Sequence, residues 1–200
     1  MSRKLKGVAL LLSILALSGA DKKDKFRPGA ASSYPSKETQ GGLTVAALAI
    51  ETKEQAKPVF DKVNPYEHGL LPVLLVMQND GAEALNLGGL TVQYLDPDGR
   101  PTEPTPAADV KYLHGARRPN MGPSPLPLPR RTPKSPLDIW EIEGMAFSVR
   151  MLPARESAHG FFYYQVKHRS GSKLLLTGMR EARTGKELFF MEINLDTPRK

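Results

Sequence analysis

The sequence predicts an all-β protein: an antiparallel β-sandwich of seven to eight short strands, with one short helix and a long proline-rich loop. Three observations support this fold class. Short apolar segments recur between clusters of turn residues, as in strands joined by tight turns. Several of these segments alternate apolar and polar residues, which is the period of a strand. No two of them are separated by a long amphipathic segment, so the crossover helices of a parallel sheet are not expected.

The chain begins with the pattern of a secretory signal peptide. Three basic residues (Arg3, Lys4 and Lys6) precede an apolar run, and Ser18-Gly19-Ala20 offers small residues at a cleavage site. The run is about 10 residues long, too short to span a membrane. We therefore expect a signal peptide over residues 1–20 that is cleaved after Ala20, and a secreted or periplasmic mature protein. Position 20 is not cysteine, so no lipid anchor is expected.

Residues 21–42 are polar and rich in lysine, proline, glycine and serine, which predicts a disordered linker. A single β-sandwich domain is expected over residues 43–197. Its first strand, 43–50, is apolar at consecutive positions and is expected to be covered on both faces. Thr52 to Gln55 has the spacing of a capping box, which predicts a short helix that Pro58 stops or distorts. Asn64-Pro65-Tyr66 then predicts a turn.

The middle of the chain alternates strands with well-formed turns. Residues 72–77 form a continuous apolar run that ends at Asp80-Gly81, a strong turn signal. The apolar pattern continues from Leu85 to Tyr94 and ends at the turn Asp96-Pro97-Asp98-Gly99. Residues 110–113 predict a weaker strand.

The C-terminal third predicts four more strands. The clearest alternation places Met145, Phe147, Val149 and Met151 on one inward face. Residues 161–166 and 174–177 predict an aromatic and an aliphatic strand. In 187–195, Phe189, Met191, Ile193 and Leu195 are expected to share a face. Because Tyr163 and Tyr164 are consecutive, one is expected to point into the core and the other outward.

Two passages resemble uncharacterised bacterial secreted or periplasmic proteins with an immunoglobulin-like β-sandwich domain. They are LPVLLVMQNDGAEALNLGGLTVQYLDPDGR and MLPARESAHGFFYYQV, the latter followed by LLLTGMREARTGKELFFMEINL. In such domains a buried strand leads to an Asn-containing turn, and a Leu-Pro-x-x-Glu segment precedes an aromatic strand. The resemblance implies an immunoglobulin-like fold and an accessory or binding role, and it carries no catalytic residue to this sequence.

Composition narrows the functional classes. The formal charge of +7 falls to +4 without residues 1–20, since Arg3, Lys4 and Lys6 are their only charged residues. A charge of +4 on 180 residues favours weak attraction to anionic envelope polymers but is not the footprint of a nucleic-acid-binding protein. The chain has no cysteine, which excludes thiol catalysis and thiolate metal sites. No cofactor motif is present, and the sequence does not indicate an oligomeric state.

The four histidines, His68, His114, His159 and His168, show no metal-ligand spacing. An alternative interpretation is a copper(I) site formed by Met145, Met151 and His159, since thioether and imidazole ligands suit that ion. Core packing of the two methionines explains them more simply. Glu141 and Glu143, at i and i+2, are read as a solvated strand face rather than a catalytic pair.

The proline-rich, basic interval 114–136 is the least ordinary part of the mature chain. It holds seven prolines and five basic residues, Arg117, Arg118, Arg130, Arg131 and Lys134. Long structureless loops are uncommon in compact domains unless they are functional or disordered. The interval is therefore either a tolerated surface insertion or a semi-rigid binding loop, and its basic residues are the candidate binding residues.

These observations favour a non-catalytic, extracytoplasmic interaction module of the bacterial envelope, whose partner is an unknown protein or an anionic envelope polymer. The alternatives are a periplasmic protein that handles copper or another metal through methionine and histidine ligands, and a hydrolase of cell-wall polymers. Convergence of methionine and histidine side chains would favour the first alternative. An acidic or histidine-containing cleft would favour the second.

Overall fold

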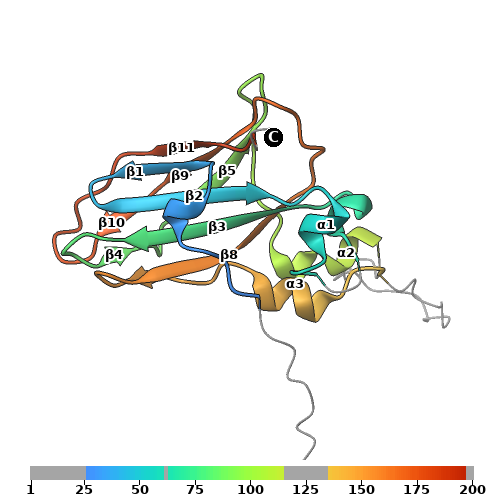
Figure 1. The fold of residues 1–200 in the computed structure, drawn as a ribbon, viewed down its shortest axis with the longest axis horizontal. Helices are drawn as coiled ribbons and strands as arrows, with labels where there is room; N and C mark the ends of the chain where they lie inside the picture. Colours follow the sequence, from blue (N-terminus) through green and yellow to red (C-terminus); the bar gives the residue numbers. More distant parts are fainter. Residues whose placement is uncertain (1–25, 61–62, 115–134, 197–200) are drawn as a thin grey trace, which may run out of the picture.

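The computed structural model describes residues 26–60, 63–114 and 135–196. Its strands are mostly short and all named pairs are antiparallel (Figure 1). They are β1 (Lys37–Gln40), β2 (Leu43–Ala49), β3 (Leu71–Asn79), β4 (Leu85–Asn86), β5 (Thr91–Leu95), β6 (Pro101–Thr102), β7 (Met151–Leu152), β8 (Ser157–Tyr164), β9 (Lys173–Thr177), β10 (Arg180–Glu181) and β11 (Met191–Asn194).

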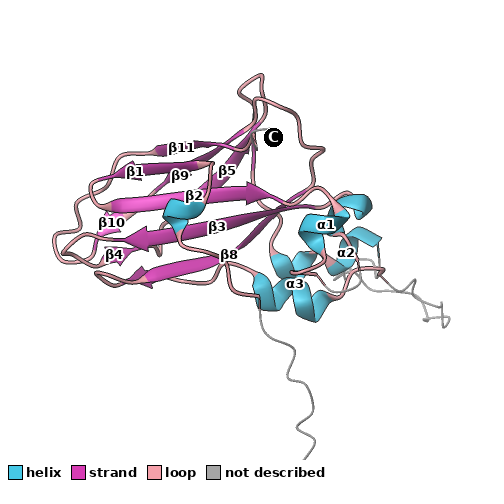
Figure 2. Ribbon diagram, in the orientation of Figure 1, coloured by secondary structure: helices cyan, strands magenta, loops and turns pink. Residues whose placement is uncertain are grey.

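The helices are few and short, as Figure 2 shows. Among the described residues, three are α-helical: α1 (Lys53–Ala56), α2 (Lys111–His114) and α3 (Ile139–Met145). Three 3₁₀ turns accompany them: η1 (Ala31–Ser33), η2 (Pro65–His68) and η3 (Ala107–Asp109). The capping box predicted from Thr52 is present, with the Thr52 hydroxyl accepting from the Gln55 amide. None of the helices in the described ranges could span a membrane.

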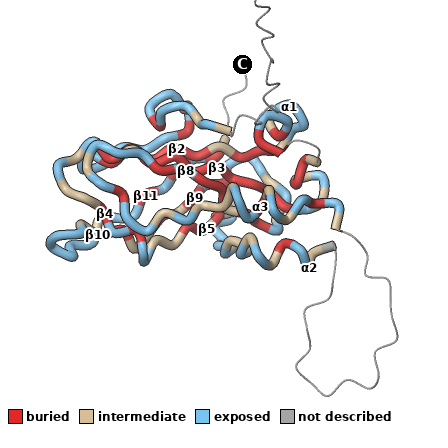
Figure 3. The backbone as a smooth tube through the Cα atoms, turned by 90° about the horizontal axis from the view of Figure 1, so that it is seen from below, coloured by how far each residue is buried: buried red, intermediate tan, exposed pale blue. Residues whose placement is uncertain are grey.

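In the described ranges, the strands form three antiparallel sheets. Sheet A has the order β1-β2-β3-β8, sheet C has the order β11-β9-β5-β6, and the small sheet B has the order β10-β4-β7. One apolar cluster joins them, with Val45, Val73 and Leu75 from sheet A meeting Val92 and Leu176 from sheet C. This cluster is the inner core of a sandwich-like, mostly β architecture (Figure 3).

Sheet A is also covered on its outer face. A second cluster joins Leu74 of β3 and Phe161 of β8 to Phe60, Val110 and Ile142 of the helical segments. The helices α1, α2 and α3 gather at one end of the sheet (Figure 1). This two-sided burial explains why β2 and β3 are apolar at consecutive positions, as the sequence predicted for β2.

Two-sided burial also corrects the prediction for the tyrosine pair. Tyr163 and Tyr164 do point to opposite faces, but neither faces solvent. The Tyr163 hydroxyl donates to the Ile142 carbonyl in α3, 2.9 Å away, and the Tyr164 hydroxyl donates to the Val92 carbonyl in β5, 3.0 Å away. The pair therefore ties sheet A to both layers that cover it, and burial raises the pKa of both hydroxyls.

Three further predictions are wrong. The proposed linker over 21–42 is structured where it is described, because β1 pairs with β2 and Ala31 is buried under the outer cluster. The strand predicted over 110–113 is instead the region of η3 and α2. Phe189 does not join the inward face of β11 but is 75% exposed, since the strand begins only at Met191.

The strand predicted over 145–151 is also wrong. Residues 139–145 form α3, capped by the Asp138 side chain, which accepts from the amides of Trp140 and Glu141. The buried side of this helix is set by Ile142, so the two glutamates lie on a helix rather than on a strand face. Only 151–152 are strand, and Met151 is 55% exposed rather than inward-facing.

Candidate functional site

The side chain of Asn79, at the end of β3, organises one end of sheet A. It is 2% exposed, and its amide nitrogen donates to the carbonyls of Glu83 (2.8 Å), Leu152 (3.3 Å) and Pro153 (3.1 Å). Its Oδ1 accepts from the Gly81 amide at 3.0 Å. The Asn-containing turn and the Leu-Pro-x-x-Glu segment, which are distant in sequence, are thus held together by one buried amide.

The main chain of Asn79 completes this junction. Its carbonyl accepts from the Arg155 amide at 2.8 Å, and its own amide donates to the Glu156 carbonyl at 3.0 Å. Arg155 has a φ of 65°, which no other non-glycine among the described residues shares in sign. Such a conformation costs of order 1–2 kcal/mol for a residue with a Cβ. The Asn79 junction therefore holds the Arg155 main chain in a conformation that it would not adopt alone.

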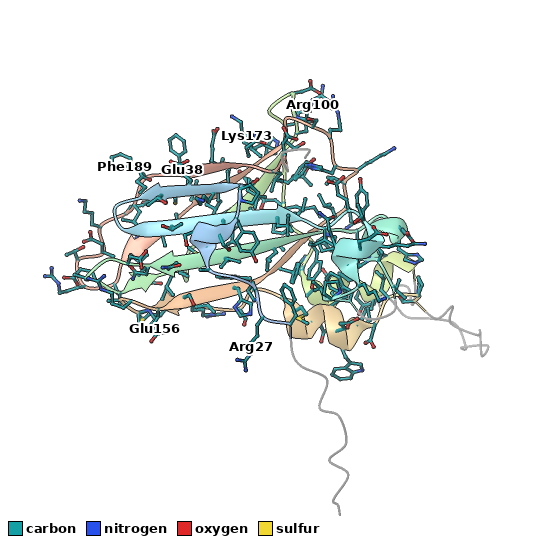
Figure 4. All side chains as sticks on the ribbon, in the orientation of Figure 1. Arg27, Glu38, Arg100, Glu156, Lys173 and Phe189 are labelled. Atoms are coloured by element: carbon teal, nitrogen blue, oxygen red, sulfur yellow. The ribbon has the colours of Figure 1, made fainter. Side chains whose placement is uncertain are left out.

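A hollow of about 450 Å³ opens beside this junction, on the outer face of sheet A. Its polar lining comes from three segments: the N-terminal stretch before η1, the end of β3, and the turn into β8 together with the start of that strand. The polar lining residues are Arg27, Gln78, Arg155, Glu156, Ser157 and His159. Val76 and the stretch Pro28–Ala30 supply its less polar walls. In Figure 4, the labelled Arg27 and Glu156 lie on the same side of the molecule, next to β8.

The hollow carries two arginines and one glutamate, and no ion pair joins them. Three arginines elsewhere are paired with carboxylates: Arg169 with Asp98, Arg180 with Glu187, and Arg183 with Glu83. Within the described part of the chain, neither Arg27 nor Arg155 has such a partner. The two guanidinium groups and the His159 imidazole therefore leave this surface able to accept an anionic group.

Most residues of this hollow were not among the predicted site residues. The sequence points to His159 only as an alternative metal ligand, and Arg27 lies in the segment predicted as a disordered linker. A sequence signal does exist in β8, where polar Ser157 and His159 are followed at the same spacing by aromatic Phe161 and Tyr163. That change on one strand face marks where the covering layer ends.

The predicted loop site lies outside the described residues. Arg117, Arg118, Arg130, Arg131 and Lys134 all belong to the interval that is not described. The same holds for the predicted signal peptide over 1–20.

The alternative metal ligands belong to three different elements. Met145 ends α3 and packs against the outer cluster, Met151 is exposed on β7 of sheet B, and His159 lies on the outer face of β8. Among the described residues, no group of three or more histidine, aspartate or glutamate side chains is arranged to hold a metal. Nothing in this arrangement favours the copper interpretation.

A second polar group lies inside the sandwich, around His168, whose side chain is 6% exposed. Its Nδ1 is 3.2 Å from the Tyr94 hydroxyl, and its Nε2 is 3.8 Å from a Glu51 carboxylate oxygen. The Tyr94 hydroxyl donates to Ser172 Oγ at 2.7 Å, and Ser172 Oγ donates to the Arg169 carbonyl at 2.6 Å. Because the Ser172 hydroxyl is buried and bound to Tyr94 rather than to the imidazole, this network fixes the 165–172 loop and does not resemble a nucleophile with its base.

Large apolar side chains are exposed at two further places. Phe189 and Phe190 are 75% and 61% exposed just before β11, and Trp140 is 85% exposed on α3. A smaller hollow of about 390 Å³ lies beside α1 and η2, where Lys53 pairs with Glu67. Neither surface presents two unpaired arginines as the first hollow does.

No protein-family model matches the chain, and the search of curated proteins finds no match. Among solved structures, the chain is similar to the crystal structure of the yjhA protein from Bacillus subtilis. The identity is 10%, the TM-score is 0.36, and the match covers 72% of this chain and 78% of that one. A likeness at this level says nothing about function.

Proposed function

We propose that this protein is a non-catalytic binding module that acts outside the cytoplasm, in the envelope of a bacterium, and that its partner carries anionic groups. The scaffold in this proposal is an immunoglobulin-like sandwich, supported by the antiparallel sheets around a common inner core. The observation that carries the functional part is the hollow beside Asn79, which presents two unpaired arginines.

Unpaired, solvated arginines are suited to binding rather than to stabilising the fold. A surface ion pair contributes only about 0–1 kcal/mol to stability. Leaving these two arginines without an internal partner therefore lowers the stability of the fold very little. Arginine presents a planar array of donors that matches carboxylate and phosphate groups. Anionic polymers of the envelope carry both groups, and an acidic protein surface carries the first.

The location outside the cytoplasm rests on the predicted signal peptide. In this proposal the mature chain begins at Asp21, and the hollow lies close to that end, since Arg27 is part of its lining. N-terminal sequencing of the protein from the culture medium or periplasm is expected to find Asp21. A chain that retains Met1 and sediments with membranes would contradict the location.

The binding role is tested with purified cell-wall sacculi, prepared with and without their anionic polymers. The exported protein is expected to co-sediment with intact sacculi, less so at high salt and less so after the polymers are removed. The double variant Arg27→Ala, Arg155→Gly is expected to lose this binding. The matched control is Arg100→Ala, since Arg100 is also exposed and unpaired among the described residues but lies at a different edge of the molecule (Figure 4). Equal co-sedimentation of all three proteins would refute the proposal.

A further inference from the structure

We propose that the hollow beside Asn79 binds an acidic sugar, that is, a sugar unit carrying a phosphate or a carboxylate group. This inference rests on the proposed binding role and names the ligand class of the same site. It follows from three features of the hollow: the placement of its two arginines, the presence of one carboxylate in its wall, and its size.

The two arginines are anchored from different parts of the chain. Arg155 is fixed through its main chain by Asn79, as described above. Arg27 follows Phe26, whose ring packs against Phe161 with centroids 6.1 Å apart. Both guanidinium groups thus start from main-chain positions held by buried contacts, while their own ends remain in solvent. The main chain at both positions therefore needs no reordering on binding, and only the two side chains are ordered by the ligand.

Glu156 determines what else the ligand must carry. Its carboxylate is exposed in the same wall and forms no ion pair within the described residues, so it repels a ligand that is anionic throughout. A carboxylate beside arginines is instead suited to a ligand with hydroxyl donors next to an acid group. Ser157 adds a hydroxyl, and the amide of Gln78 donates to Asp80 at 3.0 Å, which leaves its carbonyl oxygen to accept from the ligand.

The size of the hollow suits a small organic molecule better than a lone ion. A volume of about 450 Å³ lies in the range of sites for small organic molecules, about 300–1,000 Å³. Val76 and the Pro28–Ala30 stretch give less polar walls against which the C–H face of a sugar ring can pack. A sugar unit with one acid group meets all of these conditions. In this arrangement its acid group faces Arg27 and Arg155. Its hydroxyl groups face Glu156, Ser157 and Gln78.

The experiment measures binding of four probes to the mature protein by NMR titration: glucose 6-phosphate, glucuronate, glucose and inorganic phosphate. At least one of the two acidic sugars is expected to bind at least about tenfold more tightly than glucose and inorganic phosphate, and the comparison between them identifies the acid group. Arg27→Ala and Arg155→Gly are each expected to weaken this binding by about tenfold. Glycine is chosen at 155 because it keeps the positive φ. Arg100→Ala is expected to leave binding unchanged.

Each contrary outcome has a defined meaning. Inorganic phosphate that binds as tightly as the acidic sugars would overturn the inference in favour of a simple anion site. If neither acidic sugar binds while sacculus binding still depends on Arg27 and Arg155, the ligand class is wrong and the binding role stands. If neither kind of binding depends on these arginines, both the inference and the proposed function are refuted. Unchanged thermal unfolding of the variants shows that any loss of binding is not a loss of fold.

Discussion

The Asn79→Ala variant offers the most direct test of how this molecule is held together. The two N–H groups of the Asn79 side chain donate to three carbonyls, and its Oδ1 accepts one further hydrogen bond from the Gly81 amide. Alanine removes these interactions, equivalent to about three hydrogen bonds at about 1 kcal/mol each. We therefore expect the free energy of unfolding to fall by about 3 kcal/mol. For a domain of this size that corresponds to about 6–12 °C in Tm.

The matched control is Asn86→Ala. Asn86 has the same kind of local bond, its Oδ1 accepting from the Gly88 amide at 2.8 Å, but it is exposed and makes no long-range contact of this type. Its loss is expected to cost less than about 1 kcal/mol. Urea unfolding followed by circular dichroism measures both variants. If Asn79→Ala costs no more than Asn86→Ala, the buried side-chain amide does not hold the two motifs together. The main-chain hydrogen bonds of residue 79 to Arg155 and Glu156 remain in both variants.

Two further predictions concern the covered faces of sheet A. Gly160→Ala would place a Cβ 2.5 Å from the Cα of Phe147, so urea unfolding is expected to show a loss of at least about 2 kcal/mol. Gly144→Ala on the exposed side of α3 meets no atom within 4 Å and is expected to gain up to about 1 kcal/mol. Equal effects would contradict the close approach of the Phe147 main chain to β8. Because burial raises the pKa of Tyr163 and Tyr164 in the folded state, stability is fully present below the unfolded tyrosine pKa of about 10 and falls above it, by up to about 1.4 kcal/mol per pH unit for each tyrosine. Tyr163→Phe is expected to remove only its own share of that slope in unfolding experiments between pH 10 and pH 11, since Tyr34 and Tyr66, whose pKa burial also raises, keep theirs. An unchanged slope would refute the contribution of the Tyr163 hydroxyl.

Sequence patterns predicted the structure well where one local rule decides the outcome. The capping box at Thr52 formed as expected because its hydrogen bonds lie within four residues. The turn at Asp96 also formed, with its Oδ1 accepting from the amides of Asp98 and Arg100. The apolar strands at 43–49 and 71–79 were visible because both of their faces are buried.

The wrong predictions fall on segments whose structure is decided by contacts with other parts of the chain. The alternation from Met145 to Met151 spans the end of α3 and an irregular segment. The residues before Met145 are helical because Asp138 caps the helix and Ile142 is buried against Tyr163. Likewise, β1 has a fully exposed polar sequence and forms only because β2 pairs with it. Neither outcome is encoded within the segment itself, so a local reading could not find it.

The candidate site was missed for a related reason, and its position follows from the same two-sided burial. On the outer face of β8, Phe161 and Tyr163 lie under the covering helices, whereas Ser157 and His159 do not. The neighbouring strand β3 changes from apolar to polar at the same level. Leu74 lies opposite Phe161, and Gln78 lies opposite Ser157. Two strands that turn polar together on one face indicate where the covering layer stops. A hollow at that boundary has a rigid sheet as its floor and solvent above it, which is the setting in which unpaired arginines can meet an external ligand without first breaking a contact of the fold.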